Sequence, residues 1–133
     1  MNSKLKNRVI KKCVNDFSLS NCRTLHFSFI VIKNKIISVG WNNARKSHPI
    51  AKTYGHRYHC IHAELHAINN LYRRDVRLDK IKLINVRIFK NGTFGIAKPC
   101  DVCCRLLRDL NINDIWHTNE SGEFIKMSIS NIL

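Results

Sequence analysis

The chain has 133 residues, 44% of them apolar, and its 23 lysines and arginines face only nine acidic residues. This composition is typical of a folded protein, and the absence of an apolar run of about 18 residues excludes a membrane span, so we expect one domain over residues 1–133 and no membrane partner. The net charge of +14 favours a polyanionic partner such as single-stranded nucleic acid, although an organism with a lysine-rich proteome would give the same excess.

The N-terminus and the cysteines indicate where the protein resides. Residues 1–12 are basic, but no apolar segment follows them, so they do not form a secretory signal. The six cysteines have no spacing that suggests a disulfide framework. We therefore expect a reducing, cytoplasmic environment.

The first elements are a helix and a hairpin. Residues 3–15 carry apolar side chains at helical spacing between lysines, and Ser3 is suited to cap this helix. The β-rich segments 25–32 and 36–41 flank a short polar turn, which predicts two antiparallel strands.

A polar segment follows the second strand. Asn42 stands at the end of that strand, where an asparagine also suits a simple turn. Residues 44–61 then form a long loop in which basic and aromatic side chains alternate, a mixture that can grip a nucleic-acid backbone and stack on bases, or can cap a pocket. The candidate nucleic-acid contacts are Arg45, Lys46, Lys52, Arg57 and Tyr58, with Lys98 from a later loop.

Two clusters in the middle of the chain have the spacing of a metal site. His62 stands two residues before Glu64, and Cys100 and Cys103 are three residues apart, which puts both thiols on one side of a helix. Three such ligands leave the fourth tetrahedral position of a zinc ion open, as in catalytic sites. We therefore predict one catalytic Zn²⁺ held by His62, Cys100 and Cys103, with its bound water activated near neutral pH and Glu64 moving protons. A structural zinc site, or free cysteines in a core, is the competing interpretation.

The site is expected where two helices begin. Pro99 before Cys100 suits a helix start, and His62 reads as part of another first turn. On a regular helix His62 and Glu64 point in different directions, so they meet at one metal only if it lies off the helix end. There the positive end of the helix dipole favours thiolates.

The remaining elements complete an α/β pattern. Apolar periodicity predicts two helices and three strands, over residues 62–74 and 100–110 and over 83–89, 112–118 and 123–129, with a turn-rich loop over 90–98. The second of these helices joins two strands that are then parallel, with a right-handed crossover. We predict a three-layer α/β/α sandwich with a mixed five-stranded sheet.

The motifs His62-Ala63-Glu64 and Pro99-Cys100-Asp101-Val102-Cys103 resemble the signature of the zinc-dependent cytidine and deoxycytidylate deaminase superfamily, which includes CMP/dCMP-type and APOBEC-like enzymes. The resemblance covers roughly residues 25–125 and implies a cytidine deaminase-like fold. It also implies that Asn42 contacts the sugar of the substrate, that the backbone at Ala63 contacts the base, and that Trp116 or His117 stacks on it. Trp116 is equally suited to the core.

The resemblance implies hydrolytic conversion of cytosine to uracil. We expect single-stranded DNA or RNA as substrate, because of the charge and the basic loop; the alternative is a free nucleotide such as dCMP, or cytidine. Adenosine deamination on tRNA, suggested by Gly40-Trp41-Asn42, and a non-catalytic zinc module that binds nucleic acid are further alternatives.

Overall fold

The computed structural model describes residues 1–16, 25–42, 62–71, 77 and 80–127. Nine helices and strands lie in this part of the chain: α1 (Ser3–Asn15), β1 (Leu25–Ile32), β2 (Lys35–Trp41), α3 (Ala63–Asn69), β3 (Lys82–Ile88), β4 (Phe94–Gly95), α4 (Asp101–Asp109), β5 (Asp114–Thr118) and β6 (Phe124–Lys126). None of the helices among these residues has the length and apolar character that crossing a membrane requires.

The strands form one mixed sheet in the order β2-β1-β3-β5-β6, and β4 pairs with β3 outside this path. β3 and β5 are parallel, as expected for strands joined through a helix, and the other pairs are antiparallel. The sixth strand, β4, differs from the expected loop over 90–98. A turn with Gly92 at a φ of 87° folds residues 94–95 back on β3, and a two-residue strand is too short to leave a periodic pattern.

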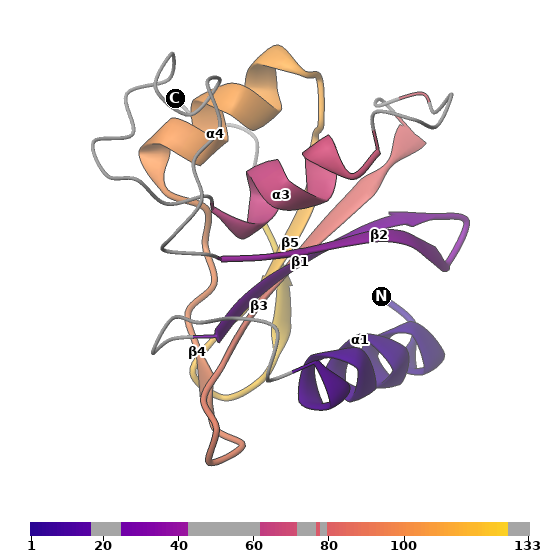
Figure 1. Ribbon diagram of the computed structural model, residues 1–133. Coiled ribbons are helices and arrows are strands. Elements are labelled where there is room, and N and C mark those ends of the chain that lie inside the picture. Colours follow the sequence, from indigo (N-terminus) through magenta and orange to yellow (C-terminus); the bar gives the residue numbers. More distant parts are fainter. Residues whose placement is uncertain (17–24, 43–61, 72–76, 78–79, 128–133) are drawn as a thin grey trace.

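Helices cover both faces of the sheet, with α1 on one face and α3 and α4 on the other (Figure 1). On the α1 face, Leu5 and Val9 pack with Phe27, Phe29 and Ile84. The opposite face is a second apolar cluster, formed by the buried residues Ile30, Leu65, Ala67, Ile68, Leu71, Ile81, Leu83, Cys104, Leu106, Leu107, Ile112, Ile115 and Met127. The three-layer α/β/α sandwich predicted from the sequence is therefore confirmed.

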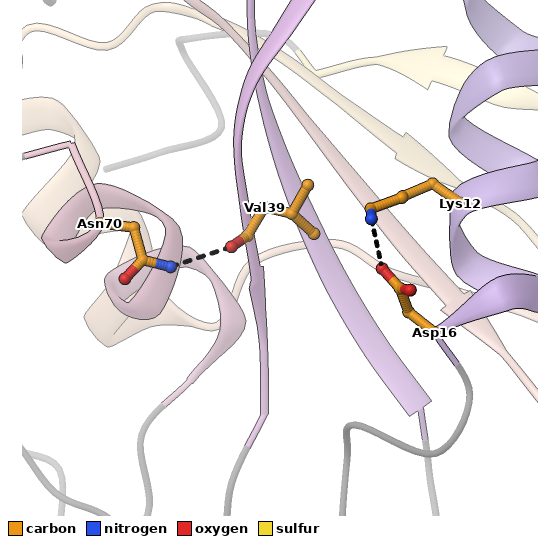
Figure 2. A network of polar contacts seen from close by, with 4 residues as sticks. All are labelled: Lys12, Asp16, Val39 and Asn70. Atoms are coloured by element: carbon orange, nitrogen blue, oxygen red, sulfur yellow. Dashed lines mark hydrogen bonds and ion pairs between the residues drawn. The ribbon is translucent and has the colours of Figure 1, made fainter.

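Helix α1 forms over the predicted residues, but its cap differs. The side chain of Asn2, not Ser3, accepts a hydrogen bond from the backbone N–H of Leu5 at 2.7 Å. At the other end Lys12 and Asp16 form an ion pair at 3.1 Å (Figure 2). Asn2 and Ser3 both suit an N-cap, so residue type alone does not tell which of the two caps the helix.

Helix α3 is fixed to the edge strand β2, and this contact determines where the site lies. Ser38 donates a hydrogen bond to the carbonyl oxygen of Ala67 at 2.8 Å, and Asn70 donates to that of Val39 at 3.0 Å (Figure 2). Gly40 permits the close approach, since a Cβ atom there would lie 2.2 Å from the backbone nitrogen of Ala67. The helix ends at Asn69, so the predicted end at residue 74 was too late; residues 72–74 lie outside the described part of the chain.

Candidate functional site

Three predicted metal ligands come together at the N-terminal ends of α3 and α4. His62 is the N-cap residue of α3 and Cys100 that of α4, both with extended backbone, and Cys103 lies in the first turn of α4. His62 Nδ1 is 3.7 Å from Cys100 Sγ and 3.4 Å from Cys103 Sγ. The N-terminal ends of α3 and α4 therefore point at one location. A metal there lies off the end of α3, where His62 and Glu64 can both approach it.

The three donor atoms fit zinc. All lie within 4.8 Å of one another. Zinc bonds to sulfur and to imidazole nitrogen, arranged tetrahedrally, separate the two donors by about 3.5 Å, which agrees with the observed contacts. The described residues add no fourth histidine, cysteine or carboxylate to this group, which leaves a position for water or substrate.

The two thiols have opposite tendencies to ionise. A hydrogen bond from Cys103 lowers the pKa of Cys100 to about 3, assisted by one from His62. The hydrogen bond to Cys100 and burial raise the pKa of Cys103. The pKa of His62 is raised, chiefly by its hydrogen bond to Cys100. Before metal binds, the site thus holds one thiolate, and the second sulfur must lose a proton to become a ligand.

Glu64 is buried in the first turn of α3, with 2% of its surface exposed, and its carboxylate is held from the sheet. Asn85 on β3 donates a hydrogen bond to Glu64 Oε1 at 2.8 Å and another to the carbonyl oxygen of Ala97 at 3.2 Å. The Asn85 side-chain oxygen accepts a bond from Ser28 Oγ at 2.6 Å. This network orients the carboxylate and satisfies the polar groups buried with it.

Asn85 and Ser28 are absent from the residues predicted from the sequence. Each interrupts an apolar stretch, Asn85 between Ile84 and Val86 and Ser28 between Phe27 and Phe29. Both are fully buried. A polar residue inside an apolar strand was the available signal, because such a group needs a buried partner.

We expect Asn85→Ala to reduce kcat about tenfold and to destabilise the fold by about 1–3 kcal/mol, because Glu64 loses its donor and buried partners are left unpaired. Asn91→Ala is a matched control, since it removes asparagine hydrogen bonds in the exposed turn before β4. Turnover, bound zinc and the unfolding midpoint would be measured for both variants. Equal kcat values for the two variants would show that Asn85 does not position Glu64.

The expected substrate contacts are only partly brought together. Asn42 follows β2 and accepts a hydrogen bond from the backbone N–H of His26 at 3.1 Å, at the same end of the sheet as the metal ligands. Ala63, which stands between His62 and Glu64 in the sequence, is buried. His117 pairs with Asn85 across β5 and β3, and so lies on the α3 face.

Trp116 lies on the other face of the sheet, away from the metal ligands. It packs against the cluster formed with α1, and its indole N–H donates to Asp114 at 2.9 Å. Neighbouring residues of a strand point to opposite faces, so Trp116 and His117 cannot both face the metal. The structure thus corrects the expectation that Trp116 stacks on the base; its alternative place in the core is observed.

The expected nucleic-acid contacts fall mostly outside the described residues. Arg45, Lys46, Lys52, Arg57 and Tyr58 lie in the part of the chain that is not described. Lys98 is exposed immediately before Pro99 and Cys100, on the approach to α4.

Comparison with known proteins agrees with this geometry. Residues 3–118 match the family model of the cytidine and deoxycytidylate deaminase zinc-binding region. A search of curated proteins finds no match.

Solved structures share the fold at low sequence identity. The dCMP deaminase from the cyanophage S-TIM5, in its apo form, is 18% identical with a TM-score of 0.61, over 91% of this chain and 87% of that chain. The cytidine deaminase from Burkholderia pseudomallei is 15% identical with a TM-score of 0.65, over 100% and 97% of the two chains. The cytidine deaminase from Mycobacterium leprae is 16% identical with a TM-score of 0.57, over 93% and 92%. The family match over most of the sequence, with the three zinc-compatible ligands in place, shows that the chain belongs to the cytidine and deoxycytidylate deaminase family and is a zinc-dependent deaminase.

Proposed function

We propose that the protein hydrolyses the amino group of cytosine in a nucleotide, with Glu64 as its catalytic proton carrier and His62, Cys100 and Cys103 as zinc ligands. The observation that carries this proposal is the buried Glu64 carboxylate, fixed by Asn85 beside a three-ligand site. A site that only stabilised the fold would have no use for such a carboxylate.

In the proposed reaction water is activated at the zinc, Glu64 transfers protons, and other residues hold the substrate. Bound zinc supplies Lewis acidity, which lowers the pKa of a water molecule toward neutrality. Glu64 accepts one proton from the attacking water and passes it to the ring nitrogen. It then takes the second proton from the hydroxyl now bonded to the ring carbon and delivers it to the amine, so that the C–N bond breaks as the carbonyl forms. Water and cytosine are consumed, and uracil and ammonia are formed. Asn42, Ala63 and His117 are proposed to hold the sugar and the base.

We propose a free nucleotide as the first substrate. The dCMP deaminase from cyanophage S-TIM5 has been crystallised with dCMP and dUMP, and 90% of this chain aligns with that structure at a TM-score of 0.61. The likeness supports the fold, and the substrate of that protein gives the proposal its chemical class.

Single-stranded DNA or RNA is the second candidate, and the observation that favours it is charge. Helix α1 has no acidic residue and carries five basic ones, Lys4, Lys6, Arg8, Lys11 and Lys12. Lys98 is exposed near the metal ligands, and Arg45, Lys46, Lys52, Arg57 and Tyr58 belong to the same proposal. Such a surface attracts polyanions.

Zinc-loaded protein would be incubated with deoxycytidine, dCMP, CMP, and single-stranded DNA and RNA that contain cytosine, and uracil would be measured by mass. We expect conversion of dCMP with a Michaelis constant that changes little with salt. Conversion of polymer alone, with an apparent affinity that falls steeply as salt rises, would overturn the free-nucleotide proposal. No conversion of any cytosine substrate would overturn the reaction itself.

We propose that residues 1–133 form a single domain in a reducing, cytoplasmic compartment. Among the described residues no disulfide joins Cys13, Cys100, Cys103 or Cys104, which agrees with this proposal. Zinc ligation needs the two site cysteines reduced, and the protein would lose activity under oxidising conditions.

A further inference from the structure

Two polar side chains next to Glu64 have no role in the mechanism above. His26 on β1 pairs with Arg87 on β3, two positions along the ladder from the pair Ser28 and Asn85. Residues two apart on a strand point to the same face, so His26 and Arg87 share the face of Asn85 and Glu64. Both lie toward the end of the sheet where the metal ligands meet.

Each of these side chains buries a nitrogen that lacks a partner. Within the described part of the chain, His26 Nε2 and Arg87 Nε are the buried side-chain nitrogen or oxygen atoms without a hydrogen bond. Leaving a buried donor unsatisfied costs about 1–3 kcal/mol, and native structures contain few such groups. Two of them on neighbouring strands indicate a partner that the described residues do not provide.

His26 interacts electrostatically with Glu64 and with two of the candidate metal ligands, His62 and Cys100. Burial lowers the pKa of His26, and the charges of Glu64, Arg87, His62 and Cys100 also act on it. His26 is also joined to a proposed sugar contact. The backbone N–H of His26 donates to Asn42 Oδ1 at 3.1 Å, and the N–H of Asn42 donates to the carbonyl oxygen of His26 at 3.2 Å.

Arg87 connects this location to an open cavity of about 300 Å³. Its guanidinium carbon lies 5.6 Å from the centre of the Phe89 ring, and the missing side chain of Gly95 gives it space, since a Cβ atom there would be 2.9 Å from Arg87 Cδ. The cavity is lined by Arg87, Phe89, Phe94, Gly95, Ile96 and Glu120. Glu120 is the acidic residue in this lining. Among the described residues, neither Glu120 nor any other acidic side chain forms an ion pair with Arg87.

We propose that Arg87 and His26 form a phosphate-binding subsite for the nucleotide substrate. This inference rests on the proposed function. Asn42, His26 and Arg87 follow one another across the end of the sheet, so a nucleotide with its base at Glu64 and its sugar at Asn42 would bring its phosphate to Arg87. An arginine offers several N–H donors in a fork that matches phosphate oxygens, and a neutral histidine donates one more from Nε2 in the corresponding tautomer. The reaction is therefore selective for nucleotides over nucleosides.

The test measures product binding, so it does not depend on turnover. Zinc-loaded protein would be titrated calorimetrically with deoxyuridine, with dUMP, and with a single-stranded oligodeoxyuridylate that lacks terminal phosphates. We expect dUMP to bind about 10–100-fold more tightly than deoxyuridine, the range of a charge-assisted hydrogen bond. Arg87→Met should remove most of this difference and leave deoxyuridine binding unchanged. A parallel loss for the oligomer would identify a phosphodiester as the ligand, and a loss for dUMP alone a terminal phosphate.

Two further variants make the result decisive. Arg8→Met removes the same charge from α1 on the opposite face of the sheet, and we expect it to keep the dUMP preference. His26→Phe should narrow the preference by a smaller factor, and it replaces Arg87→Met as the test if that variant fails to fold. An unchanged ratio of dUMP to deoxyuridine affinity in the folded variants would overturn the proposal. Phosphate-dependent binding without any deamination would instead contradict the proposed reaction and leave the subsite standing.

Discussion

Glu64→Gln is expected to reduce kcat by about 10²–10⁴ while the protein keeps its zinc, the range found for positioned acid–base groups. The amide has nearly the shape of the carboxylate and still accepts the hydrogen bond that Asn85 donates at 2.8 Å. It cannot take a proton from water or pass one to the leaving amine. Deamination of dCMP under saturating substrate, together with the zinc content of the same samples, checks this expectation.

Glu123→Gln is the matched control for this variant. Glu123 is exposed in the turn before β6, and its backbone N–H donates to Asn119 at 2.9 Å, so the same chemical change there should leave kcat unaltered. Should Glu64→Gln lose zinc in proportion to activity, Glu64 would be a ligand or a structural group, and another residue would have to carry the protons.

Cys103→Ser is expected to abolish detectable turnover because zinc no longer binds at working concentrations. Cys103 is fully buried, and its sulfur is 3.4 Å from His62 Nδ1, so the substitution removes one of the three donor atoms of the site. Changes to residues that only support a metal ligand already weaken binding about 10–100-fold, and loss of the ligand itself should cost at least about a hundredfold. Cys104→Ser changes the neighbouring buried thiol, whose sulfur is 3.5 Å from the Pro99 carbonyl oxygen, and should retain zinc and activity. Zinc loss from both variants to the same extent would assign the effect to disturbed packing of α4.

The ionisation of the thiols adds a pH dependence to this prediction. At neutral pH Cys100, with a pKa of about 3, is already a thiolate, whereas the raised pKa of Cys103 keeps its proton until metal binds. Zinc binding therefore releases about one proton, and zinc affinity should rise about tenfold per pH unit. At lower pH the raised pKa of His62 adds a second proton to displace, so the decline becomes steeper. Competition with a chelator across this pH range measures the slope, and a flat profile would mean that Cys103 is ionised without metal.

The sequence predicted those parts of the molecule that depend on local spacing. Helix α1 and strand β1 have the expected residues, and β2 begins one residue earlier than expected, at Lys35. The turn between the strands places Lys33 and Asn34 at positive φ, as a tight hairpin turn requires. The spacing of His62, Cys100 and Cys103 indicated the candidate ligands whose donor atoms lie within 4.8 Å of one another, and the alternation of helices and strands indicated the fold class.

The missed features depend on which residues meet across the sheet. Asn85 reaches Ser28 over a separation of 57 residues, and only the register of β1 against β3 brings them together. Trp116 and His117 remained alternatives as the stacking residue, because alternation along β5 allows either one to face the site. Ile115 is buried in the cluster with α3 and α4, so the next residue, Trp116, points to the face covered by α1. Register and facing are tertiary facts, and a single sequence carries little information about them.

The position of the ligands at two helix starts also bears on how the chain holds its metal. His62 and Cys100 are separated by 38 residues, and the nitrogen and sulfur atoms they contribute are 3.7 Å apart. In an unfolded chain, joining the ends of a loop of that length costs about 4 kcal/mol of chain entropy, by the estimate used for covalent cross-links. The folded chain has closed this loop in advance, which corresponds to roughly a thousandfold gain in effective ligand concentration. Because zinc binds the folded chain more tightly than the unfolded one, bound zinc raises the free energy of unfolding. The lifetime of the native enzyme therefore depends on the zinc concentration around it.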